Sequence, residues 1–496
     1  MVLKPVRVRF APSPTGHTHL GSGRTALYNY LLARQTGGQF ILRLEDTDRK
    51  RYVPNAETEL AEGLRWLGLE WDEGFDVGGG YGPYRQSERR DIYLHYAKWL
   101  VDHGHAYYCF CSPDQIEKVR QQQIRLKQNP RYDRTCRLLD PDEANRRVSS
   151  GEKYVIRFKV PDSGKIVMSD LLRGNISVEN QNLDDSIIVK SDGLALYHLA
   201  AMVDDHLMKI THVIRGSEWL STFPLHAHIV RAFGWSEPIW VHLSLFLKPS
   251  GKGKMSKRDV ARLGQEGYSI FLKDLENLGY LPEAVVNWIA LMGWSYDDRT
   301  ELFSMKDLIE KFSLERCTPS PAAINFAKLD YFNGTYIRSL TNDDLTHRLK
   351  PYYDVIGLIV DDNTLRRIVP LIQERIVTLD DAPVMSRFLL EDDIALDPTG
   401  FIDKDIDKEN AIEILSKSKL LLVGLESLEP QTTEIAFRNL ASVLPIKLPQ
   451  LFRILRLAIT GQAISPPLIE SMAVIGKERV LKRIDFAIES IRYGTP

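Results

Sequence analysis

Charged residues stand at the ends of two short apolar runs near the start of the chain. Arg9 belongs to VRVRF, and Glu45 and Asp46 follow FILRL. Strands of a parallel sheet normally carry Val, Ile or Leu at such positions. A buried guanidinium needs an anion, and a nearby carboxylate suits an ammonium group. The two charges therefore predict either a site for a zwitterionic amino acid or an ordinary Arg9–Glu45 ion pair across neighbouring strands.

A glycine-rich turn, HTHLGSG at 17–23, lies between these two runs. His17 and His19 offer N–H donors to a phosphate at the start of the helix that follows, and the glycines let a base or ribose approach the backbone. The pattern G-x-G-x-x-A starting at Gly21 also fits a dinucleotide site, with Glu45 near the place of its acidic residue. The turn alone leaves both kinds of nucleotide site open.

A second glycine-rich segment, PSGKGKMSKRDV at 249–260, interleaves glycines with basic side chains. Its glycines allow mobility, and Lys254, Lys257 and Arg258 supply positive charge that can close over a polyphosphate and stabilise a leaving pyrophosphate. A generic cluster of lysines would be an ordinary solvated loop. The order K-M-S-K-R is not generic, and it favours a phosphate-binding loop.

The elements that must position these groups alternate between strand and helix. Apolar residues alternate with arginines at 6–10, recur at helical spacing over 22–34, and form a second strand in QFILRL, which predicts a βαβ unit of a parallel sheet. The fold class expected is α/β, with a Rossmann-type parallel sheet, an inserted α+β domain and an all-α C-terminal region. The predicted ranges are 1–106 and 191–250 for the two halves of the sheet domain, 107–190 for the insertion, 251–325 for the loop and a helical domain, and 326–496 for the all-α region.

Bulk composition excludes several classes of protein. A chain of 496 residues is too long for one core, and 44% hydrophobic with 26% charged residues is typical of a globular protein. Lys and Arg total 64 against 66 acidic residues, so contacts with nucleic acid must come from local clusters. No apolar run is long enough to span a membrane. Four cysteines and an N-terminus that begins as a strand predict a cytoplasmic protein with reduced thiols.

Five ordered motifs resemble those of the bacterial-type and organellar glutamyl-tRNA synthetases of class I. They are APSPTGHTHLGSGRTAL, FILRLEDTDRKRYVP, GPYRQSER, VDDHLMKITHVIRGSEWL and GKMSKR, and the resemblance extends more weakly into the helical half. His19 to Ser22 match the HIGH tetrad, with Ser22 in its last place, and Lys254 to Arg258 match KMSKS. The resemblance implies that a cytoplasmic monomer activates L-glutamate with Mg-ATP and transfers it to the 3′-terminal adenosine of tRNA(Glu).

The resemblance also implies roles for single residues. Those implied in catalysis are His19, Lys254 and Lys257. Those implied in ATP binding are the same three with Gly21 and Ser22. Those implied in glutamate binding are Arg9, Ala11, Ser13, Glu45, Tyr197 and Arg215. Arg9 is expected on the side-chain carboxylate and Glu45 near the α-amino group, so the glycine-rich turn becomes an adenylate site rather than a dinucleotide site.

Three cysteines of the predicted insertion, Cys109, Cys111 and Cys136, have the spacing C-x-C-x₂₄-C. Some members of the family bind a structural zinc here, with a histidine two residues after the last cysteine. This chain has Leu138 in that place. Tyr132 is an alternative fourth ligand, as in a related truncated enzyme, and three free buried thiols are the other interpretation.

The helical half carries no catalytic constellation, and the resemblance implies that it binds the anticodon. Arg375 falls where the family inspects the last anticodon base. The basic residues that are candidates for phosphate contacts, with solvated helix faces as the alternative for each, are Arg366, Arg367, Arg375, Arg453, Arg456, Lys477, Arg479, Lys482 and Arg483.

Related functions are less consistent with the chain. Glutaminyl-tRNA synthetases have β-barrels in place of an all-α anticodon domain, and the glutamyl-Q enzyme that modifies a tRNA base lacks such a domain. A non-enzymatic tRNA-binding paralogue usually loses the motif residues, and this chain keeps His19, Lys254 and Lys257. A nicotinamide dehydrogenase has no use for a KMSKS loop.

Overall fold

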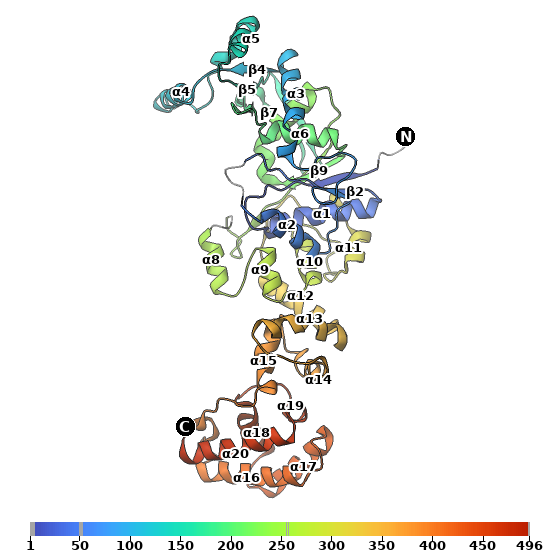
Figure 1. Ribbon diagram of the computed structural model, residues 1–496, viewed down its shortest axis with the longest axis vertical. Coiled ribbons are helices and arrows are strands. Elements are labelled where there is room, and N and C mark those ends of the chain that lie inside the picture. Colours follow the sequence, from blue (N-terminus) through green and yellow to red (C-terminus); the bar gives the residue numbers. More distant parts are fainter. Residues whose placement is uncertain (1–4, 49–52, 254, 256, 495–496) are drawn as a thin grey trace. The chain divides into compact units, whose positions relative to one another are not determined.

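The chain folds into two units in the computed structural model (Figure 1), which describes residues 5–48, 53–253, 255 and 257–494, without the side chain of Lys257. Unit 1 comprises Met1–Leu275 and Val285–Phe326, and unit 2 comprises Glu276–Ala284 and Ala327–Pro496. The described strands lie in unit 1, and the described elements of unit 2 are helices.

Unit 1 begins with the βαβ arrangement that the sequence predicts. β1 (Arg7–Phe10) and β2 (Gln39–Leu42) pair in parallel, and α1 (Leu20–Thr36) connects them. The short β3 (Glu73–Gly74) pairs with the other edge of β2, so the order is β1-β2-β3. All four residues of β1 are buried, as expected for a parallel strand that is covered on both faces.

A second, mixed sheet has the order β7-β6-β10-β9. β9 (His212–Gly216) pairs in parallel with β10 (Ile239–Leu243), and β6 (Lys165–Asp170) lies on the other edge of β10. β7 (Gly174–Glu179) pairs antiparallel with β6. The amide of Thr211, just before β9, donates to a carbonyl of β1, so the two sheets adjoin.

A third sheet is antiparallel and consists of β4 (Ala106–Cys109), β5 (Val155–Phe158) and β8 (Ile187–Val189). These strands lie at or within the ends of the predicted insertion, 107–190. β6 and β7 fall in the same range, yet they extend the sheet of β9 and β10. Strand pairing therefore links the predicted insertion to the second half of the sheet domain, and the boundaries of the insertion stay a prediction.

Helices surround these sheets. The helices that belong to unit 1 in whole or in part are α1, α2 (Ala56–Trp66), α3 (Arg90–Asp102), α4 (Pro113–Arg125), α5 (Pro141–Ser149), α6 (Tyr197–Leu207), α7 (Phe223–Ala232), α8 (Lys257–Gln265), α9 (Leu272–Asn277), α10 (Pro282–Leu291) and α11 (Met305–Lys311). Residues of α3, α6 and α7 share the main core with strand residues such as Ile166 and Trp240. The short β11 (Phe246–Leu247) pairs with β12 (Ala322–Ala323).

Unit 2 is helical throughout its described residues, as the thinning of β-branched runs predicts. Its helices are α12 (Phe326–Ser339), α13 (Asn342–Val355), α14 (Asp362–Ile372), α15 (Asp381–Leu390), α16 (Lys408–Gly424), α17 (Pro430–Val443), α18 (Leu448–Thr460), α19 (Leu468–Ile475) and α20 (Lys477–Tyr493). Side-chain caps begin several of them, as at Asp361 and Asp407. Among the described residues of the whole chain, no helix combines the length and the apolar character that crossing a bilayer requires.

Candidate functional site

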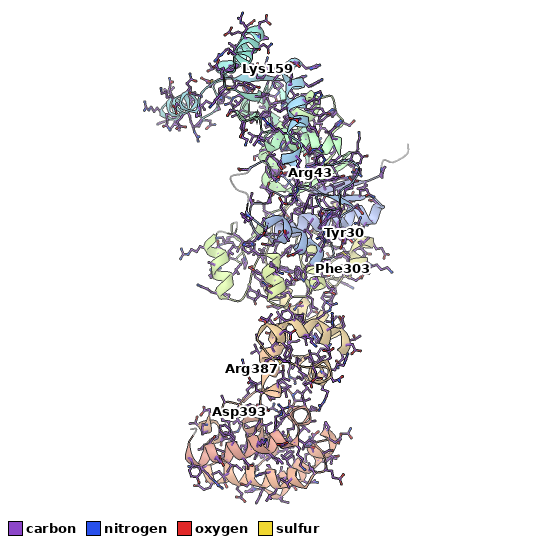
Figure 2. All side chains as sticks on the ribbon, in the orientation of Figure 1. Tyr30, Arg43, Lys159, Phe303, Arg387 and Asp393 are labelled. Carbon is purple, nitrogen blue, oxygen red and sulfur yellow. The ribbon has the colours of Figure 1, made fainter. Side chains whose placement is uncertain are left out.

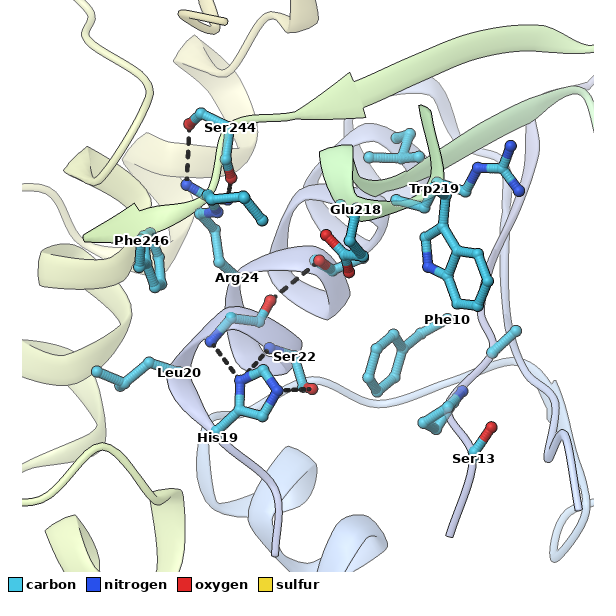
Figure 3. A pocket seen from close by; sticks show the side chains of 18 of the residues that line it. Phe10, Ser13, His19, Leu20, Ser22, Arg24, Glu218, Trp219, Ser244 and Phe246 are labelled. Carbon is cyan, nitrogen blue, oxygen red and sulfur yellow. Dashed lines mark hydrogen bonds between the residues drawn. The ribbon is translucent and has the colours of Figure 1, made fainter. Parts of the chain in front are cut away.

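One cavity of about 570 Å³ in unit 1 collects the predicted site residues (Figure 3). It lies where β1 and β9 end, which is the edge of a parallel sheet at which ligands bind. The predicted residues that line it are Arg9, Ala11, Ser13, His19, Gly21, Ser22, Glu45, Tyr197 and Arg215. Residues that line it without having been predicted include Thr15, Arg24, Glu218, Trp219, Ser244 and Phe246.

Two of the predicted catalytic residues cannot be placed by their side chains. Lys254 lies outside the described residues, and Lys257 is described only as the first backbone position of α8. Met255, which stands between them, lines the cavity. The roles of both lysines stay predictions.

Arg9 is held by Asp205 of α6. Its Nε donates to Oδ1 at 2.9 Å and its Nη2 to Oδ2 at 3.3 Å, while Nη1 lies 3.5 Å from the Ile214 carbonyl. The simple Arg9–Glu45 pair is therefore wrong. The fork to Asp205 uses one edge of the guanidinium, so one N–H on each terminal nitrogen remains for a ligand carboxylate.

Glu45 pairs with Arg43, two residues before it. Arg43 Nη2 donates to Glu45 Oε1 at 3.0 Å, and Nη1 donates to Asp205 Oδ1 at 2.8 Å. Arg43, labelled in Figure 2, is completely buried. Burial raises the pKa of Glu45 to about 7, although the Arg43 and Arg9 guanidinium groups oppose the shift. A carboxylate so poorly solvated is stabilised in its charged form by a ligand ammonium.

Arg215 reaches the same end of the cavity from β9. Its Nη1 donates to the Tyr197 hydroxyl at 3.3 Å, and its Nη2 is buried without a hydrogen-bond partner among the described residues. Burial lowers the pKa of this guanidinium, so an anion beside it is favoured. The Tyr197 ring packs on Trp219 with centroids 4.2 Å apart, which fixes the hydroxyl.

The charges at this end suit a dicarboxylic amino acid. Arg9, Arg215 and Glu45 line this end, and Asp205 behind them is divided between Arg9 and Arg43, which also lies 3.7 Å from Asp204. A ligand with two carboxylates and one ammonium offers anions to the guanidinium groups of Arg9 and Arg215 and a cation to Glu45. Asp205 and Arg43 were missed from the sequence. The two adjacent acids in the apolar run LAAMVDDHL were the available signal.

The other end of the cavity is the start of α1. His19 caps the helix, because its Nδ1 accepts hydrogen bonds from the amides of Gly21 at 3.0 Å and Ser22 at 3.3 Å (Figure 3). Nδ1 therefore carries no proton, and Nε2–H is the remaining donor of the neutral ring. Burial lowers the pKa of His19 against the opposing charge of Glu218, which favours this neutral form.

Gly21 makes the cap possible. A Cβ at this position would lie 3.0 Å from Cε1 and 3.1 Å from Nδ1 of the His19 ring, so any other residue would press on the imidazole. The Gly21 amide donates to His19 in this cap and is therefore not free to bind a phosphate. His17 pairs instead with Glu59, at 2.8 Å on the exposed surface, and is not among the lining residues.

The dinucleotide alternative is disfavoured by Glu45. Its carboxylate is buried against Arg43 and shares a cavity end with Arg9 and Arg215. A ribose-binding acid should instead face the sugar hydroxyls of the nucleotide. His19 at the helix start and the amino-acid end of the cavity fit an aminoacyl-adenylate better.

Arg24 of α1 braces the wall near His19. It donates to the carbonyls of Met292, at 2.6 Å, and Ser244, and its guanidinium lies 4.1 Å from the centroid of the Phe246 ring. These contacts tie α1 to the connection between β10 and β11, which runs on toward the K-M-S-K-R segment. Both terminal nitrogens of Arg24 donate to main-chain carbonyls, so its role is to hold the wall rather than to bind ligand.

The three cysteines of the predicted insertion lie together. Their sulfur atoms are all within 4.8 Å of one another, and Cys111 and Cys136 are 3.5 Å apart. The Tyr132 hydroxyl lies 3.3 Å from Cys109 Sγ and 3.6 Å from Cys111 Sγ. Ligand atoms of a tetrahedral zinc site are roughly 3.5–4 Å apart, so the S₃O set fits that ion. Leu138 is 91% exposed, and no disulfide joins the described cysteines.

The acidity of these thiols is uneven. Hydrogen bonding from Cys136, together with Tyr132 and Arg157, lowers the pKa of Cys109 against the effect of burial, and the same hydrogen bond raises the pKa of Cys136. Burial raises the pKa of the Tyr132 hydroxyl, and the Arg157 guanidinium lies 3.8 Å from the centroid of its ring. One sulfur is thus prepared as a thiolate, the form in which cysteine binds metal.

All nine basic candidates of unit 2 have partners within that unit. Arg483 is 3% exposed and donates to the carbonyls of Ile459, Phe388 and Glu391, so it is not available to a phosphate. Arg366 pairs with Asp343 at 2.7 Å. The other candidates that bond carbonyls or acids of unit 2 are Arg367, Arg375, Arg453, Arg456, Lys477, Arg479 and Lys482.

Comparison with known proteins identifies relatives along the whole chain. The family model of class I tRNA synthetases (E and Q), catalytic domain, matches residues 5–331, and the anticodon binding domain model matches 344–488. Glutamate–tRNA ligases from Dehalococcoides mccartyi and Borreliella burgdorferi are 45% identical over 488 residues (97% of each chain) and 43% identical over 493 residues (98% of this chain, 99% of the relative).

A solved structure is similar over nearly the same extent. The glutamate tRNA ligase from Elizabethkingia meningosepticum, crystallised with its amino acid, is 36% identical, with a TM-score of 0.90. The match covers 98% of this chain and 100% of that one.

Proposed function

The chain belongs to the class I tRNA synthetases of the glutamate and glutamine type, and from that premise we propose that it is a glutamate–tRNA ligase. It activates L-glutamate with ATP and esterifies the 3′-terminal adenosine of tRNA(Glu), releasing AMP and diphosphate. The observation that carries the proposal is one cavity with a cationic, dicarboxylate-compatible end beside a capped helix start.

The amino-acid end accounts for substrate choice. The free N–H groups of Arg9 bind the side-chain carboxylate of glutamate, and Glu45 attracts its ammonium. Arg215 and Tyr197 complete the anionic contacts, with Ala11 and Ser13 shaping the wall. In glutamine a neutral amide replaces the side-chain carboxylate, so the buried Arg9 guanidinium would have no charged partner in the ligand.

Activation requires positioning and charge stabilisation, with no protein nucleophile. The glutamate α-carboxylate attacks the α-phosphorus of Mg-ATP, and the bond to the β,γ-diphosphate breaks as that group leaves. His19 Nε2–H donates to a phosphate oxygen, and Lys254 and Lys257 neutralise the departing charge. The 2′-hydroxyl of the tRNA then attacks the mixed anhydride, and AMP leaves.

Aminoacylation with labelled amino acid tests this function. Purified enzyme is given labelled glutamate or labelled glutamine with tRNA(Glu) or tRNA(Gln), in four separate reactions. Charging of tRNA(Glu) with glutamate and no charging with glutamine is expected. Charging with glutamine instead would refute the proposal, and the glutamate reaction on tRNA(Gln) reports how strictly the enzyme discriminates between the two tRNAs.

The cysteine cluster supports a structural zinc, held by Cys109, Cys111, Cys136 and Tyr132. The ion would cross-link β4 to the segment around Tyr132 and supply no chemistry to the reaction. Elemental analysis of the purified protein should give one zinc per chain, with loss of the metal in Cys111→Ser. Zinc-free wild-type protein would instead favour three free thiols.

The remaining parts of the proposal concern organisation. The match at 344–488 supports anticodon binding by unit 2, and we infer contact of the 107–190 range with the tRNA acceptor end and of 251–325 with its stem. The family resemblance implies a cytoplasmic monomer. Light scattering on the purified enzyme should give a mass near 56.7 kDa.

A further inference from the structure

A buried chain of three side chains runs from the second sheet to the cavity. Asp170 ends β6, His242 lies in β10 and Arg215 lies in β9. His242 Nδ1 is 2.7 Å from Asp170 Oδ2, and Arg215 Nε donates to His242 Nε2 at 3.0 Å. Asp170 is 1% and His242 0% exposed, yet neither lines the cavity.

The hydrogen-bond partners of its two ring nitrogens define the protonation of His242. An arginine Nε always carries hydrogen and can only donate, so His242 Nε2 must be a bare acceptor. The Asp170 carboxylate can only accept, so Nδ1 must carry the proton. Burial lowers the pKa of His242, and the Arg215 charge acts in the same direction, which is consistent with a neutral ring.

Asp170 itself is anchored to the backbone. Its Oδ1 accepts hydrogen bonds from the amides of Leu172 at 3.1 Å and Arg173 at 3.0 Å, and its Oδ2 accepts one from the amide of His242 at 3.0 Å. Three main-chain donors therefore fix the carboxylate, and the carboxylate fixes the tautomer and the plane of the imidazole. The accepting Nε2 is thereby held at a defined place behind Arg215.

We propose that Asp170 and His242 are positioning residues that aim the Arg215 guanidinium at the bound amino acid. With Nε held by His242 and Nη1 by Tyr197, Nη2 is left for a ligand carboxylate. The inference rests on the proposed function, because it assigns Arg215 to glutamate. It adds two residues that do not line the cavity.

A neutral histidine behind Arg215 has a different effect from a carboxylate. Arg9 contacts Asp205 directly, so part of its charge is balanced before any ligand binds. The imidazole instead places a neutral ring between Arg215 and Asp170, so the guanidinium is oriented without a carboxylate in direct contact. Arg215 should therefore attract a ligand carboxylate more strongly than a directly paired arginine would.

Two substitutions of His242 separate orientation from folding. The amide of His242→Gln reaches the place of Nε2 and can still accept from Arg215, whereas the amide of His242→Asn ends near Nδ1 and leaves Arg215 without its acceptor. Pyrophosphate exchange in the presence of tRNA should show KM for glutamate raised roughly tenfold in His242→Asn and at most about threefold in His242→Gln. KM for ATP should stay within about twofold of wild type in both.

A matched control and a second measurement keep the test decisive. His228 of α7 bonds to Asn180 and does not line the cavity, so His228→Gln should leave both KM values unchanged. If His242→Asn fails to fold, ¹⁵N spectra of histidine-labelled wild-type enzyme replace it, with His242 assigned through His242→Gln. Glutamate should then shift the Nε2 resonance of His242 and leave that of His228 in place.

Several results would overturn the inference. They are a His242→Asn enzyme with normal KM for glutamate, equal losses in His242→Asn and His242→Gln, a parallel rise in KM for ATP, or an unresponsive Nε2 resonance. Failure of the proposed function is distinguishable from all of these, because the wild-type enzyme would then show no glutamate-dependent exchange of pyrophosphate into ATP.

Discussion

Arginine serves opposite purposes in the two units. In unit 1, Arg9 of the cavity and its neighbour Arg43 are buried, and Arg9 bonds to an aspartate 196 positions along the chain. In unit 2, Arg366 pairs with Asp343 at the surface, and the buried Arg483 bonds only to carbonyls. Buried ion pairs are costly to desolvate, whereas exposed pairs stabilise little. The comparison teaches that arginine alone does not mark the binding site: Arg9 and Arg215 present N–H groups to a cavity, whereas the terminal nitrogens of Arg483 are bound to main-chain carbonyls.

The largest effect is expected from Arg9→Ala. The substitution removes the partner of the ligand carboxylate and leaves Asp205 with only Arg43, so kcat/KM for glutamate should fall by roughly a thousandfold or more. Pyrophosphate exchange in the presence of tRNA measures it. Arg9→Lys keeps the charge but not the two-pronged geometry, so it should recover only a small part of the lost kcat/KM. An Arg9→Ala enzyme whose kcat/KM for glutamate is within tenfold of the wild-type value would contradict the role assigned to Arg9.

Lys257→Ala should have the next largest effect. It is expected to keep glutamate binding and to slow adenylate formation by about 100-fold, because one contact that stabilises the departing diphosphate is lost. Glutamate-dependent thermal shift measures the binding, and pyrophosphate exchange with tRNA measures the rate. Lys252, exposed in the same segment, provides the matched control. Equal losses in Lys252→Ala and Lys257→Ala would show that only the general charge of the loop matters.

Glu45→Gln should raise KM for glutamate about 50-fold at pH 8, since the ammonium loses a charged partner. The wild-type enzyme adds a pH signature, because burial raises the pKa of Glu45 to about 7 in the free enzyme. Above that pH the carboxylate is charged and KM is constant. Below it the group is neutral, so KM should rise as the pH falls. Glu45→Gln should abolish this rise, and a wild-type KM that stays constant from pH 8 to pH 6 would contradict the assignment.

The βαβ unit could be predicted from the sequence because its signals are local, whereas most cavity-lining residues were implied by the family resemblance. Alternation at 6–10 and helical spacing at 22–34 predict the strands and α1 that the structure contains. Ordered motifs indicated which side chains meet, and Arg9 and Glu45 do line one cavity. Residue type drew attention to Arg9 and Glu45 but left a simple ion pair open, and the resemblance decided between the two interpretations.

The partners of those residues could not be predicted, because pairing is decided by tertiary packing. Arg9 had a plausible partner in Glu45 on the adjoining strand segment, and the structure places Asp205 there instead. Nothing local distinguishes an acid in α6 that faces Arg9 from one that faces solvent. The same holds for His242, whose partners come from β6 and β9. A single sequence gives a residue's place on its element but not its partners on other elements.

A stability prediction follows for the buried arginine of unit 2. Arg483→Met keeps the apolar stem of the side chain but leaves the carbonyls of Ile459, Phe388 and Glu391 without their donor. Unfolding in denaturant should show a loss of about 2 kcal/mol. Arg483→Lys, which retains some donors, should lose less. If Arg483→Met instead reduced tRNA affinity with normal stability, Arg483 would act on nucleic acid despite its burial.

The smallest effect is expected from Arg366→Ala. Its ion pair joins side chains that are 45% and 79% exposed, where water solvates both charges nearly as well apart as together. The denaturation midpoint should therefore not change measurably, and added salt should not separate the variant from wild type. A shift as large as that of Arg483→Met would mean that a solvated pair stabilises unit 2 as strongly as a buried cation does. Burial would then no longer distinguish the arginines that stabilise unit 2 from those that do not.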